Sequence, residues 1–558
     1  MHDLVIKAAT VYDGSGTAAR RADVAVDDGR IVEVGPTSGA AREVVDADGL
    51  ALMPGIIDTH THYDAQITWD PMLNPSPSLG VTTVIMGNCG FTIAPCRPTD
   101  RDLVMRNLTH VEGMSLESLR SGIDWSFETF PQYLDALERR GVGPNVACFV
   151  GHSSVRTFVL RDDAPRRAAT AEEVAQMRAL VVEGMKAGAC GFSTTRNMQH
   201  NGEAGIPMPS RLADEQELLA LSSALKESGR GVLMMTKDAT TPMPFIEQLA
   251  QGAGRPYLVA ALLHSEMTPE STFEDLEHIE AAHRRGNRLY GAVSACPLTF
   301  EFTLHEPYVF EGLRAWQRLM KMDAAALKAT LSDPAFRQSV KDELAVPQRR
   351  LFNGDWKKMF VTQVAKPQNK SLEGASIHDL ARAASRHPLD FMLDLSLGEG
   401  LDTLFTGTLL NSDEEAVGRL LRDPNSIVSL SDAGAHLTFL CDAGFGLHLL
   451  GHWSRDLHAL STEHAVRKLT AEPAALFGIG DRGTIEPGKC ADLLLFDPAK
   501  VGRGKPQRVF DLPAGASRLT TPGLGVHGVW VNGERIADAD GMVPDAPTAG
   551  RVLREFAG

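Results

Sequence analysis

Several features that mark other classes of protein are missing from this 558-residue chain. No window approaches the roughly 18 uninterrupted apolar residues of a membrane-spanning helix. The N-terminal stretch Met1–Lys7 lacks the basic region and apolar run of a secretion signal. Neither a P-loop nor a dinucleotide-binding glycine fingerprint occurs, and no repeat of about 20–50 residues stands out. These absences argue against a membrane protein, a secreted protein, a nucleotide site of either kind and a solenoid.

Cysteine and positive charge are also in short supply. The seven cysteines are odd in number and scattered, which predicts reduced thiols and a cytoplasmic location rather than a disulfide framework. The formal net charge of −16 disfavours nucleic acid and anionic membrane as partners. With 43% hydrophobic and 23% charged residues, the composition is that of a globular protein. The partner we expect is a small-molecule substrate, and homo-oligomer formation is left open.

The two ends of the chain share one sequence pattern, in which short apolar runs are separated by turns. Near the N-terminus, Leu4–Ala8, Ala22–Val26 and Arg30–Val34 are expected to be strands, and a hairpin turn at Asp28-Gly29 separates the last two. The C-terminal region repeats this pattern. We therefore predict a small composite β-sandwich built from residues 1–52 and 476–558.

The region between the ends, residues 53–475, alternates apolar runs with amphipathic helical segments. The clearest helix is predicted over Thr170–Ala187, with Thr170 and Glu173 at capping-box spacing. An α/β fold, the (β/α)8 TIM barrel, follows from this alternation, and its active site lies at the C-terminal strand ends. A helical insertion before the last strand is expected over about 303–359. The predicted strands are Leu52–Asp58, Val81–Met86, Asn145–Val150, Ala189–Ser193, Gly231–Met235, Leu258–Leu263, Arg288–Ser294 and Ile427–Leu430.

Residues suited to metal binding follow these apolar runs. His60 and His62 come after the first run, and alternate side chains on an extended chain share a face, so both imidazoles can reach one ion. Nearly all the other runs also end in polar residues. Imidazole, thiolate and carboxylate together suit zinc or a similar divalent ion. The strand-end groups are Asn88-Cys89, His152-Ser153, Thr194-Thr195-Arg196, Thr236-Lys237-Asp238, His264-Ser265-Glu266, Cys296 and Asp432–His436.

These motifs carry a resemblance to a known family. The chain resembles the amidohydrolase superfamily and, within it, the N-acyl-D-amino-acid deacylases, also called D-aminoacylases. The resemblance runs nearly from end to end and implies a metal-dependent hydrolase that acts on a carbon–nitrogen bond other than a peptide bond. The motifs that carry it are PGIIDTHTHYD, GVTTVIMGNCGFTIAP, GHSSVR, GACGFSTT, SDAGAH and the tail VRKLTAEPAALFGIGDRGTIEPGKCADLLLFDP.

The resemblance also implies roles for individual residues. His60 and His62 match the metal pair of the first strand, and Cys89 matches a cysteine ligand that can bridge two metal positions. His264 matches the ligand on the sixth strand. Asp432 matches the eighth-strand aspartate that touches the metal and shuttles the proton, and it is therefore the predicted catalytic residue. The implied cofactor is one or two Zn²⁺ ions, with another divalent metal left open.

One metal position departs from the family pattern. The family places a histidine ligand at the end of the fifth strand, where this chain has Thr236 and Lys237. Threonine is a poor zinc ligand, and a protonated lysine has no lone pair to donate. Two outcomes stay open: a carboxylated Lys237 as ligand, or an altered site in which His60, His62, Cys89 or Asp432, and His264 hold the metal.

The expected substrate contacts depart as well. Where the family has a tyrosine after its fourth-strand motif, this chain has Arg196, which either forks onto a substrate carboxylate or lies in a surface loop. His152 is the other substrate-binding candidate, with a packed barrel histidine as its alternative. The arginine that the family places soon after the eighth-strand motif is absent from His436–Cys441. We therefore expect a more apolar pocket wall than in a typical deacylase.

These observations are compatible with three functions. The first is metal-assisted hydrolysis of an amide in a small molecule, with Asp432 as general base and then acid. The second is hydrolysis of a cyclic amide or lactone by the same chemistry. The third, prompted by the missing fifth-strand histidine, is a barrel that has lost its metal and acts as a scaffold.

Overall fold

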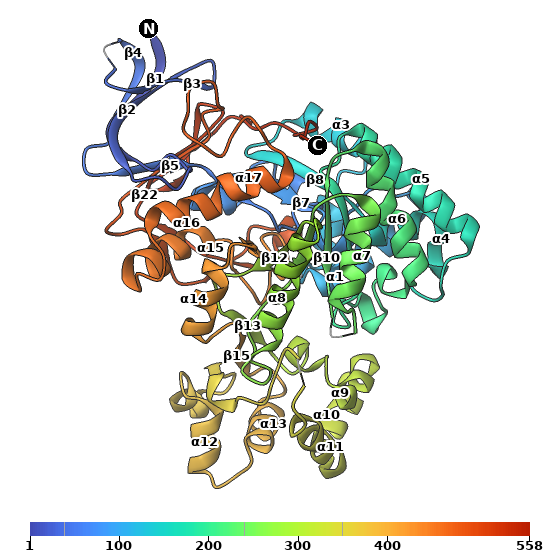
Figure 1. The fold of residues 1–558 in the computed structure, drawn as a ribbon. Helices are drawn as coiled ribbons and strands as arrows, with labels where there is room; N and C mark the ends of the chain where they lie inside the picture. Colours follow the sequence, from blue (N-terminus) through green and yellow to red (C-terminus); the bar gives the residue numbers. More distant parts are fainter. Residues whose placement is uncertain (38, 239, 349) are drawn as a thin grey trace.

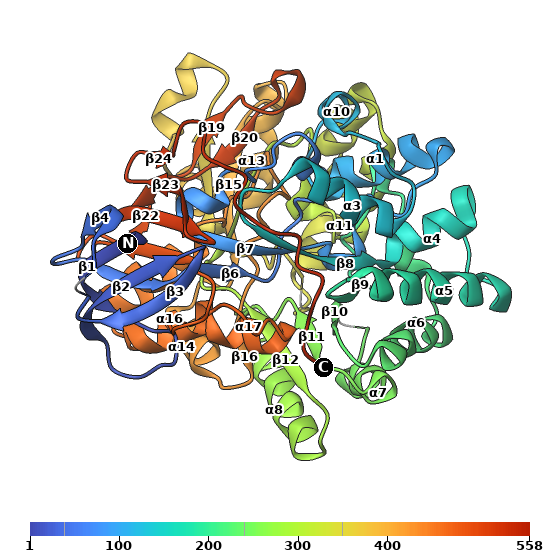
Figure 2. The same cartoon turned by 90° about the horizontal axis from the view of Figure 1, so that it is seen from above.

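A curled, eight-stranded parallel sheet forms the centre of the computed structural model, which describes residues 1–37, 39–238, 240–348 and 350–558 (Figures 1 and 2). After the first and last strands, the N–H of His62 donates to the carbonyl of Ala433 (2.8 Å). The sheet therefore closes on itself at the carboxyl ends of these strands. Its strands, in chain order, are β6 (Ile56–Asp58), β7 (Val81–Met86), β8 (Asn145–Gly151), β9 (Gly191–Thr195), β10 (Val232–Thr236), β11 (Tyr257–Ala260), β12 (Leu289–Val293) and β16 (Ser426–Val428).

Helices cover the outer face of this sheet, as an alternating α/β fold requires. The predicted helix at Thr170 is confirmed: its capping box is formed by Thr170 and Glu173, and it ends at the left-handed Gly188. Among the described helices, none has both the length and the apolar character needed to cross a membrane. The helices of this layer are α1 (Arg101–Val111), α2 (Leu116–Gly122), α3 (Phe130–Arg140), α4 (His152–Leu160), α5 (Ala171–Ala187), α6 (Glu215–Ser228), α7 (Met243–Ala253), α8 (Ser271–Arg284), α14 (Glu414–Arg422), α15 (Phe445–His448), α16 (Thr462–Leu469) and α17 (Ala471–Phe477).

A second, nine-stranded sheet joins the two ends of the chain. The predicted run Leu52–Asp58 divides at Gly55: its first half, β5, pairs with β1 and β17 in this sheet, and its second half begins the parallel sheet as β6. Division at this point explains how one apolar run serves two sheets. The strands are β1 (His2–Val11), β2 (Arg20–Asp27), β3 (Arg30–Gly35), β4 (Ala41–Asp46), β5 (Ala51–Pro54), β17 (Leu493–Phe496), β22 (Val526–Val531), β23 (Glu534–Asp538) and β24 (Gly541–Met542). Two short ladders accompany it, β18 (Gly502–Arg503) with β21 (Gly523–Leu524) and β19 (Gln507–Val509) with β20 (Arg518–Thr520).

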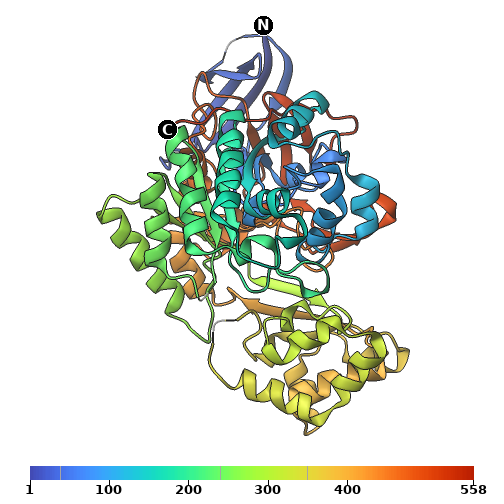
Figure 3. The ribbon, with the colours of Figure 1, turned by 90° about the vertical axis from the view of Figure 1, so that its right-hand side faces the viewer.

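The segment between β12 and β16 forms a separate lobe with its own apolar core around Phe310, Trp316 and Phe336 (Figures 1 and 3). The lobe is longer than the insertion expected over about 303–359, because the strands that begin and end it pair with each other across the intervening chain. It projects from the barrel on the side opposite the nine-stranded sheet. Its elements are β13 (Leu298–Phe302), α9 (Arg314–Gln317), α10 (Ala324–Ser332), α11 (Pro334–Leu344), β14 (Met359–Gln363), α12 (Ile377–Ala383), α13 (Pro388–Gly398) and β15 (Leu404–Leu410).

Candidate metal centre

His60 and His62 lie on the extended segment that follows β6, and both are almost completely buried, with 2% and 5% of their surfaces exposed. Their ring centroids are 5.3 Å apart in an edge-to-face arrangement. The segment is held against the end of β16, where Gly434 packs against it. A Cβ on Gly434 would lie 2.8 Å from the carbonyl carbon of His62, so glycine is required for this approach. The alternation in sequence therefore places both imidazoles on one side, as predicted.

Cys89 reaches the same point from the turn after β7. The turn is tight: Cys89 has φ = +57°, and a Cβ on Gly90 would meet the carbonyl of Ser193 at 3.1 Å. The thiol sulfur lies 3.5 Å from Nε2 of His60 and 3.1 Å from Oγ1 of Thr236. One ligand atom from each of His60, His62 and Cys89 falls within 4.8 Å of the others. Three residues from two strand ends thus present donors to one volume.

Asp432 completes this group from the segment after β16. Its Oδ1 lies 3.2 Å from Nε2 of His60 and 3.7 Å from Nε2 of His62. Burial raises the pKa of the Asp432 carboxyl, but interactions with the neighbouring histidines His60, His62 and His436 outweigh burial and bring the pKa well below its ordinary value. Asp432 is therefore an ionised carboxylate that can accept a proton.

The donor set fits a divalent metal ion. Burial lowers the pKa of His60 to about 3, so its imidazole is neutral, which is the form that ligates. Burial raises the pKa of the Cys89 thiol, and a nearby cation is what would favour its thiolate. Two imidazoles, a thiol and a carboxylate in a buried cluster are chemically suited to zinc. We call His60, His62, Cys89 and Asp432 the metal cluster.

Glu112, at the C-terminal end of α1, is a member of the site that the sequence motifs do not indicate. It is buried, and its Oε1 lies 3.2 Å from Nδ1 of His62. Burial lowers the pKa of His62, but Glu112 and Asp432 outweigh it and the pKa lies well above its ordinary value. A carboxylate at Nδ1 also orients the ring so that Nε2 faces the other ligands. No motif marks Glu112, because the helix that carries it is distant from the strand ends in sequence.

The metal cluster opens into a cavity of about 390 Å³. A larger hollow, of about 520 Å³, lies near Trp125 and contains none of the cluster residues. The cavity lining includes the apolar side chains of Phe91, Phe300 and Tyr308, the last two of which belong to the lobe. Its volume is in the range of small-molecule sites. The site can therefore hold a small substrate next to the cluster.

His264 and Lys237 are not brought into the metal cluster. His264 is buried after β11, and its Nδ1 has no hydrogen-bond partner among the described residues, but it lies outside the group of ligand atoms and outside the cavity lining. Lys237 lines the cavity, yet its Nζ donates to both carboxylate oxygens of Asp275 (2.6 and 2.7 Å). An ammonium group in that arrangement has no lone pair for a metal. The fifth-strand residue beside Cys89 is Thr236.

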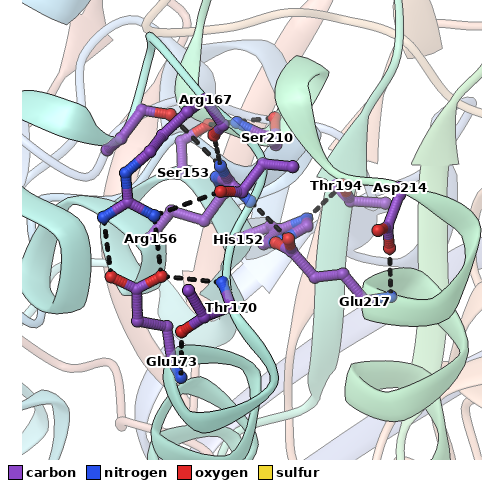
Figure 4. Close-up of polar contacts among 12 residues, drawn as sticks. His152, Ser153, Arg156, Arg167, Thr170, Glu173, Thr194, Ser210, Asp214 and Glu217 are labelled. Atoms are coloured by element: carbon purple, nitrogen blue, oxygen red, sulfur yellow. Dashed lines mark hydrogen bonds and ion pairs between the residues drawn. The ribbon is translucent and has the colours of Figure 1, made fainter.

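His152, predicted as a substrate contact with a packed barrel histidine as its alternative, has the surroundings of the packed histidine (Figure 4). It is completely buried, its Nε2 lies 2.7 Å from Oε1 of Glu217, and its Nδ1 lies 2.8 Å from Oγ1 of Thr194. The other carboxylate oxygen of Glu217 pairs with the buried Arg156. Because both ring nitrogens are in hydrogen bonds with protein groups, His152 has no free nitrogen for a ligand. Figure 4 shows His152 and Arg156, both on α4, beside Glu217 of α6.

Arg196, the second predicted substrate contact, also lies outside the cavity lining among the described residues. The loop after β9 enters the cavity only from Asn197 onward, and the buried His200 lies there. Sequence reasoning missed His200 because it belongs to no strand-end motif. The position of a loop histidine relative to a cavity depends on how the loop folds back, which no local pattern records.

Comparisons with known proteins show which family the chain is similar to. The sequence profile of the amidohydrolase family matches residues 43–537. The chain is 30% identical to a D-aminoacylase from Alcaligenes xylosoxydans xylosoxydans over 564 aligned positions, which cover 100% of this chain and 98% of that protein. Among solved structures, a D-aminoacylase studied for its binuclear metal centre superposes with a TM-score of 0.68 at 26% identity, with 100% of both chains covered. The N-acyl-D-glutamate deacylase of Bordetella bronchiseptica, solved with zinc and a phosphonate inhibitor, shows likeness in fold (TM-score 0.67, 24% identity, 99% of this chain and 100% of that one).

Proposed function

The chain belongs to the amidohydrolase family, and we propose that it is a metal-dependent deacylase that hydrolyses the amide bond of N-acyl-D-amino acids. The observation that carries the proposal is the convergence of His60, His62 and Cys89 within 4.8 Å, with Asp432 beside them, at a small-molecule cavity. Similarity to a D-aminoacylase along the whole chain supports the substrate class.

The proposed cofactor is zinc, as one or two ions, with other divalent metals open to test. His60, His62, Cys89 and Asp432 would hold it, and His264, whose buried Nδ1 lacks a hydrogen-bond partner among the described residues, is the further donor proposed from the family resemblance. When bound, such an ion lowers the pKa of a water molecule and polarises a carbonyl group.

In the proposed mechanism Asp432 moves the proton. Its ionised carboxylate removes a proton from the attacking water as the water oxygen bonds to the amide carbon. The same carboxyl then delivers that proton to the amide nitrogen as the carbon–nitrogen bond breaks. The products are a carboxylate and a free amino acid. The apolar wall around Phe91 and Phe300 excludes water from the remainder of the cavity and suits an apolar portion of the substrate.

The alternatives of a cyclic-amide or lactone hydrolase and of a metal-depleted scaffold are not favoured, because a D-aminoacylase and two further N-acyl-D-amino-acid deacylases align with 99–100% of the chain at 27–30% identity. The proposal also covers the composite sheet, the domain boundaries and the cellular location. The nine-stranded sheet corresponds to the composite β-sandwich of the family. The domains comprise residues 1–52, 53–475 and 476–558. A cytoplasmic location is inferred from the seven unpaired cysteines.

The test is a substrate panel on the purified protein with its metal content measured. We expect turnover of N-acetyl-D-amino acids that exceeds turnover of the L-enantiomers, and loss of that turnover after dialysis against a chelator, with recovery on adding zinc. A hydantoin and a lactone serve as comparison substrates. Preferential turnover of the cyclic compounds would replace the proposal by the second function, and absence of any metal-dependent turnover would reject both.

A further inference from the structure

His200 approaches the cavity from the loop that follows β9. It lines the cavity together with His60, His62 and Asp432, and only 8% of its surface is exposed. Its ring packs edge-on against Phe91, with centroids 5.0 Å apart, and Phe91 in turn lies beside His62 at 6.1 Å. The imidazole is therefore held in one orientation at the wall of the site.

Hydrogen bonds determine which nitrogen of His200 carries the proton. Nδ1 of His200 lies 2.8 Å from Oγ1 of Thr195. The Thr195 hydroxyl donates its single hydrogen to the carbonyl of Thr236 (3.3 Å), and it also accepts from the N–H of Asn197 (3.1 Å). With the hydroxyl hydrogen directed at that carbonyl, the 2.8 Å contact takes its hydrogen from Nδ1 of His200. Nε2 then has a lone pair and no hydrogen.

The surroundings keep the ring in this neutral form. Burial brings the pKa of His200 well below its ordinary value, and the nearby His436 and His62 lower it further. A neutral ring of this tautomer can accept a hydrogen bond at Nε2 but cannot donate one. It is thereby unsuited to bind a substrate carboxylate or to stabilise an oxyanion, because both need a donor.

The residue that ends strand β10 leaves room for His200 at the wall of the cavity. Strand β10 ends in Thr236, whose hydroxyl contacts Cys89 at 3.1 Å and whose carbonyl accepts from Thr195. The end of β10 thus contributes no histidine. It holds His200, from the loop after β9, through the hydrogen bond between Thr195 and the carbonyl of Thr236. One ligand atom from each of His60, His62 and Cys89 lies within 4.8 Å of the others, and this group does not include His200, which lines the same cavity.

We infer that His200 is a substrate-contacting residue, whose Nε2 accepts a hydrogen bond from the N–H of the scissile amide. The inference rests on the proposed amide hydrolysis. The scissile amide has one N–H donor, and His200 has one lone pair to receive it. Holding that N–H fixes the amide plane, so that the nitrogen is positioned to take the proton from Asp432 when the bond breaks.

The test compares an amide with the ester that lacks the N–H. The substrates are an N-acetyl-D-amino acid and the matching O-acetyl-2-hydroxy acid, with His200→Ala compared with the wild type. Loss of one hydrogen bond predicts a fall of about tenfold in kcat/KM for the amide and little change for the ester. His527→Gln, at an exposed position on β22, is the control that should leave both unchanged. Equal losses on the two substrates, or a loss of bound zinc in His200→Ala, would overturn the inference.

A measurement independent of turnover separates this inference from the proposed function. Protein labelled with ¹⁵N-histidine gives the protonation of each ring nitrogen by NMR, and His200 is identified by comparison with His200→Ala. We expect hydrogen on Nδ1 of His200 in the wild type and redistribution toward Nε2 in Thr195→Val. A hydrogen on Nε2 in the wild type rejects the inference even if deacylase activity is present. If the wild type hydrolyses another amide instead, the same amide and ester comparison is made on that compound.

Discussion

Two polar clusters lie next to the same parallel sheet, the metal cluster at its strand ends and the other on helices α4 and α6, and they differ in how their hydrogen-bonding groups are used. In the metal cluster, His60 and Cys89 direct donor atoms into a shared volume, and Nδ1 of His60 is buried without a partner among the described residues. In the cluster of His152, Arg156 and Glu217, both nitrogens of the imidazole and both oxygens of the carboxylate are bonded to protein. The first arrangement leaves donor atoms available for a ligand, and in the second the corresponding atoms are hydrogen-bonded within the protein.

This difference shows why residue type alone does not identify a site. Both clusters contain a histidine that follows a strand end and a carboxylate, and apart from the partly exposed Asp432 both are protected from solvent. Burying a charged group is costly unless the group is paired; in the second cluster the imidazole and the carboxylate are fully bonded, and only Nε of Arg156 lacks a partner among the described residues. An unsatisfied cluster is stable only if something else, such as an ion or a substrate, completes it. Changes that disturb each cluster should therefore have separable effects.

The largest effect is expected for Asp432→Asn in the metal cluster. Without a carboxylate to accept the proton of water, kcat should fall by about 10²- to 10⁴-fold. The histidines and Cys89 stay in place and the asparagine side chain keeps an oxygen at the same position, so zinc at saturating concentration should remain bound and the unfolding temperature should change little. Turnover on N-acetyl-D-amino acids and metal analysis check both statements. Wild-type turnover with zinc still present would contradict the role of Asp432.

The next effect is expected for Glu217→Ala in the His152 cluster. Removing this carboxylate leaves the buried Arg156 without its charge partner, which should lower the free energy of unfolding by about 3–5 kcal/mol. Glu215→Ala, an exposed position on the same helix, is the matched control, with an expected change below about 1 kcal/mol. Urea titration measures both. Similar midpoints for the two variants would show that the cluster does not stabilise the fold.

Cys89→Ser tests the metal cluster without removing a charged partner. Serine is nearly isosteric but a poor zinc ligand, so zinc affinity should fall by at least the roughly 10- to 100-fold that loss of a supporting contact costs. Stability of the zinc-free protein should be unchanged within about 0.5 kcal/mol. Competition with a chromogenic chelator measures the affinity. An unaltered affinity would exclude the thiol from the ligand set.

The smallest effect is a pH dependence in the His152 cluster. Burial lowers the pKa of His152 in the folded protein. Below about pH 6.5 the unfolded chain therefore binds a proton at this position and the folded protein does not, so the free energy of unfolding decreases as the pH is lowered. His152→Gln should be less stable at pH 7.5 but should lose less between pH 6.5 and 5.5, by up to about 1.4 kcal/mol. Unfolding titrations at these pH values provide the comparison. A parallel loss in both proteins would mean that His152 is protonated in the fold.

Sequence patterns determined much of this protein. The alternation of His60 and His62 on an extended segment, the tight turn around Cys89 and the capped helix from Thr170 are local features, and local geometry follows from a few neighbouring residues. The resemblance to a deacylase family likewise depends on motifs that are contiguous in sequence.

Only the tertiary structure decided which of the remaining polar residues face the cavity. His152 follows a strand end yet turns into a satisfied cluster, whereas His200, in a loop without a motif, is anchored at the wall of the site through Thr195. Glu112 reaches His62 from the end of a helix distant in sequence. The physical reason is that burial and hydrogen bonding depend on partners brought together by long-range packing, and the chain order does not record those partners.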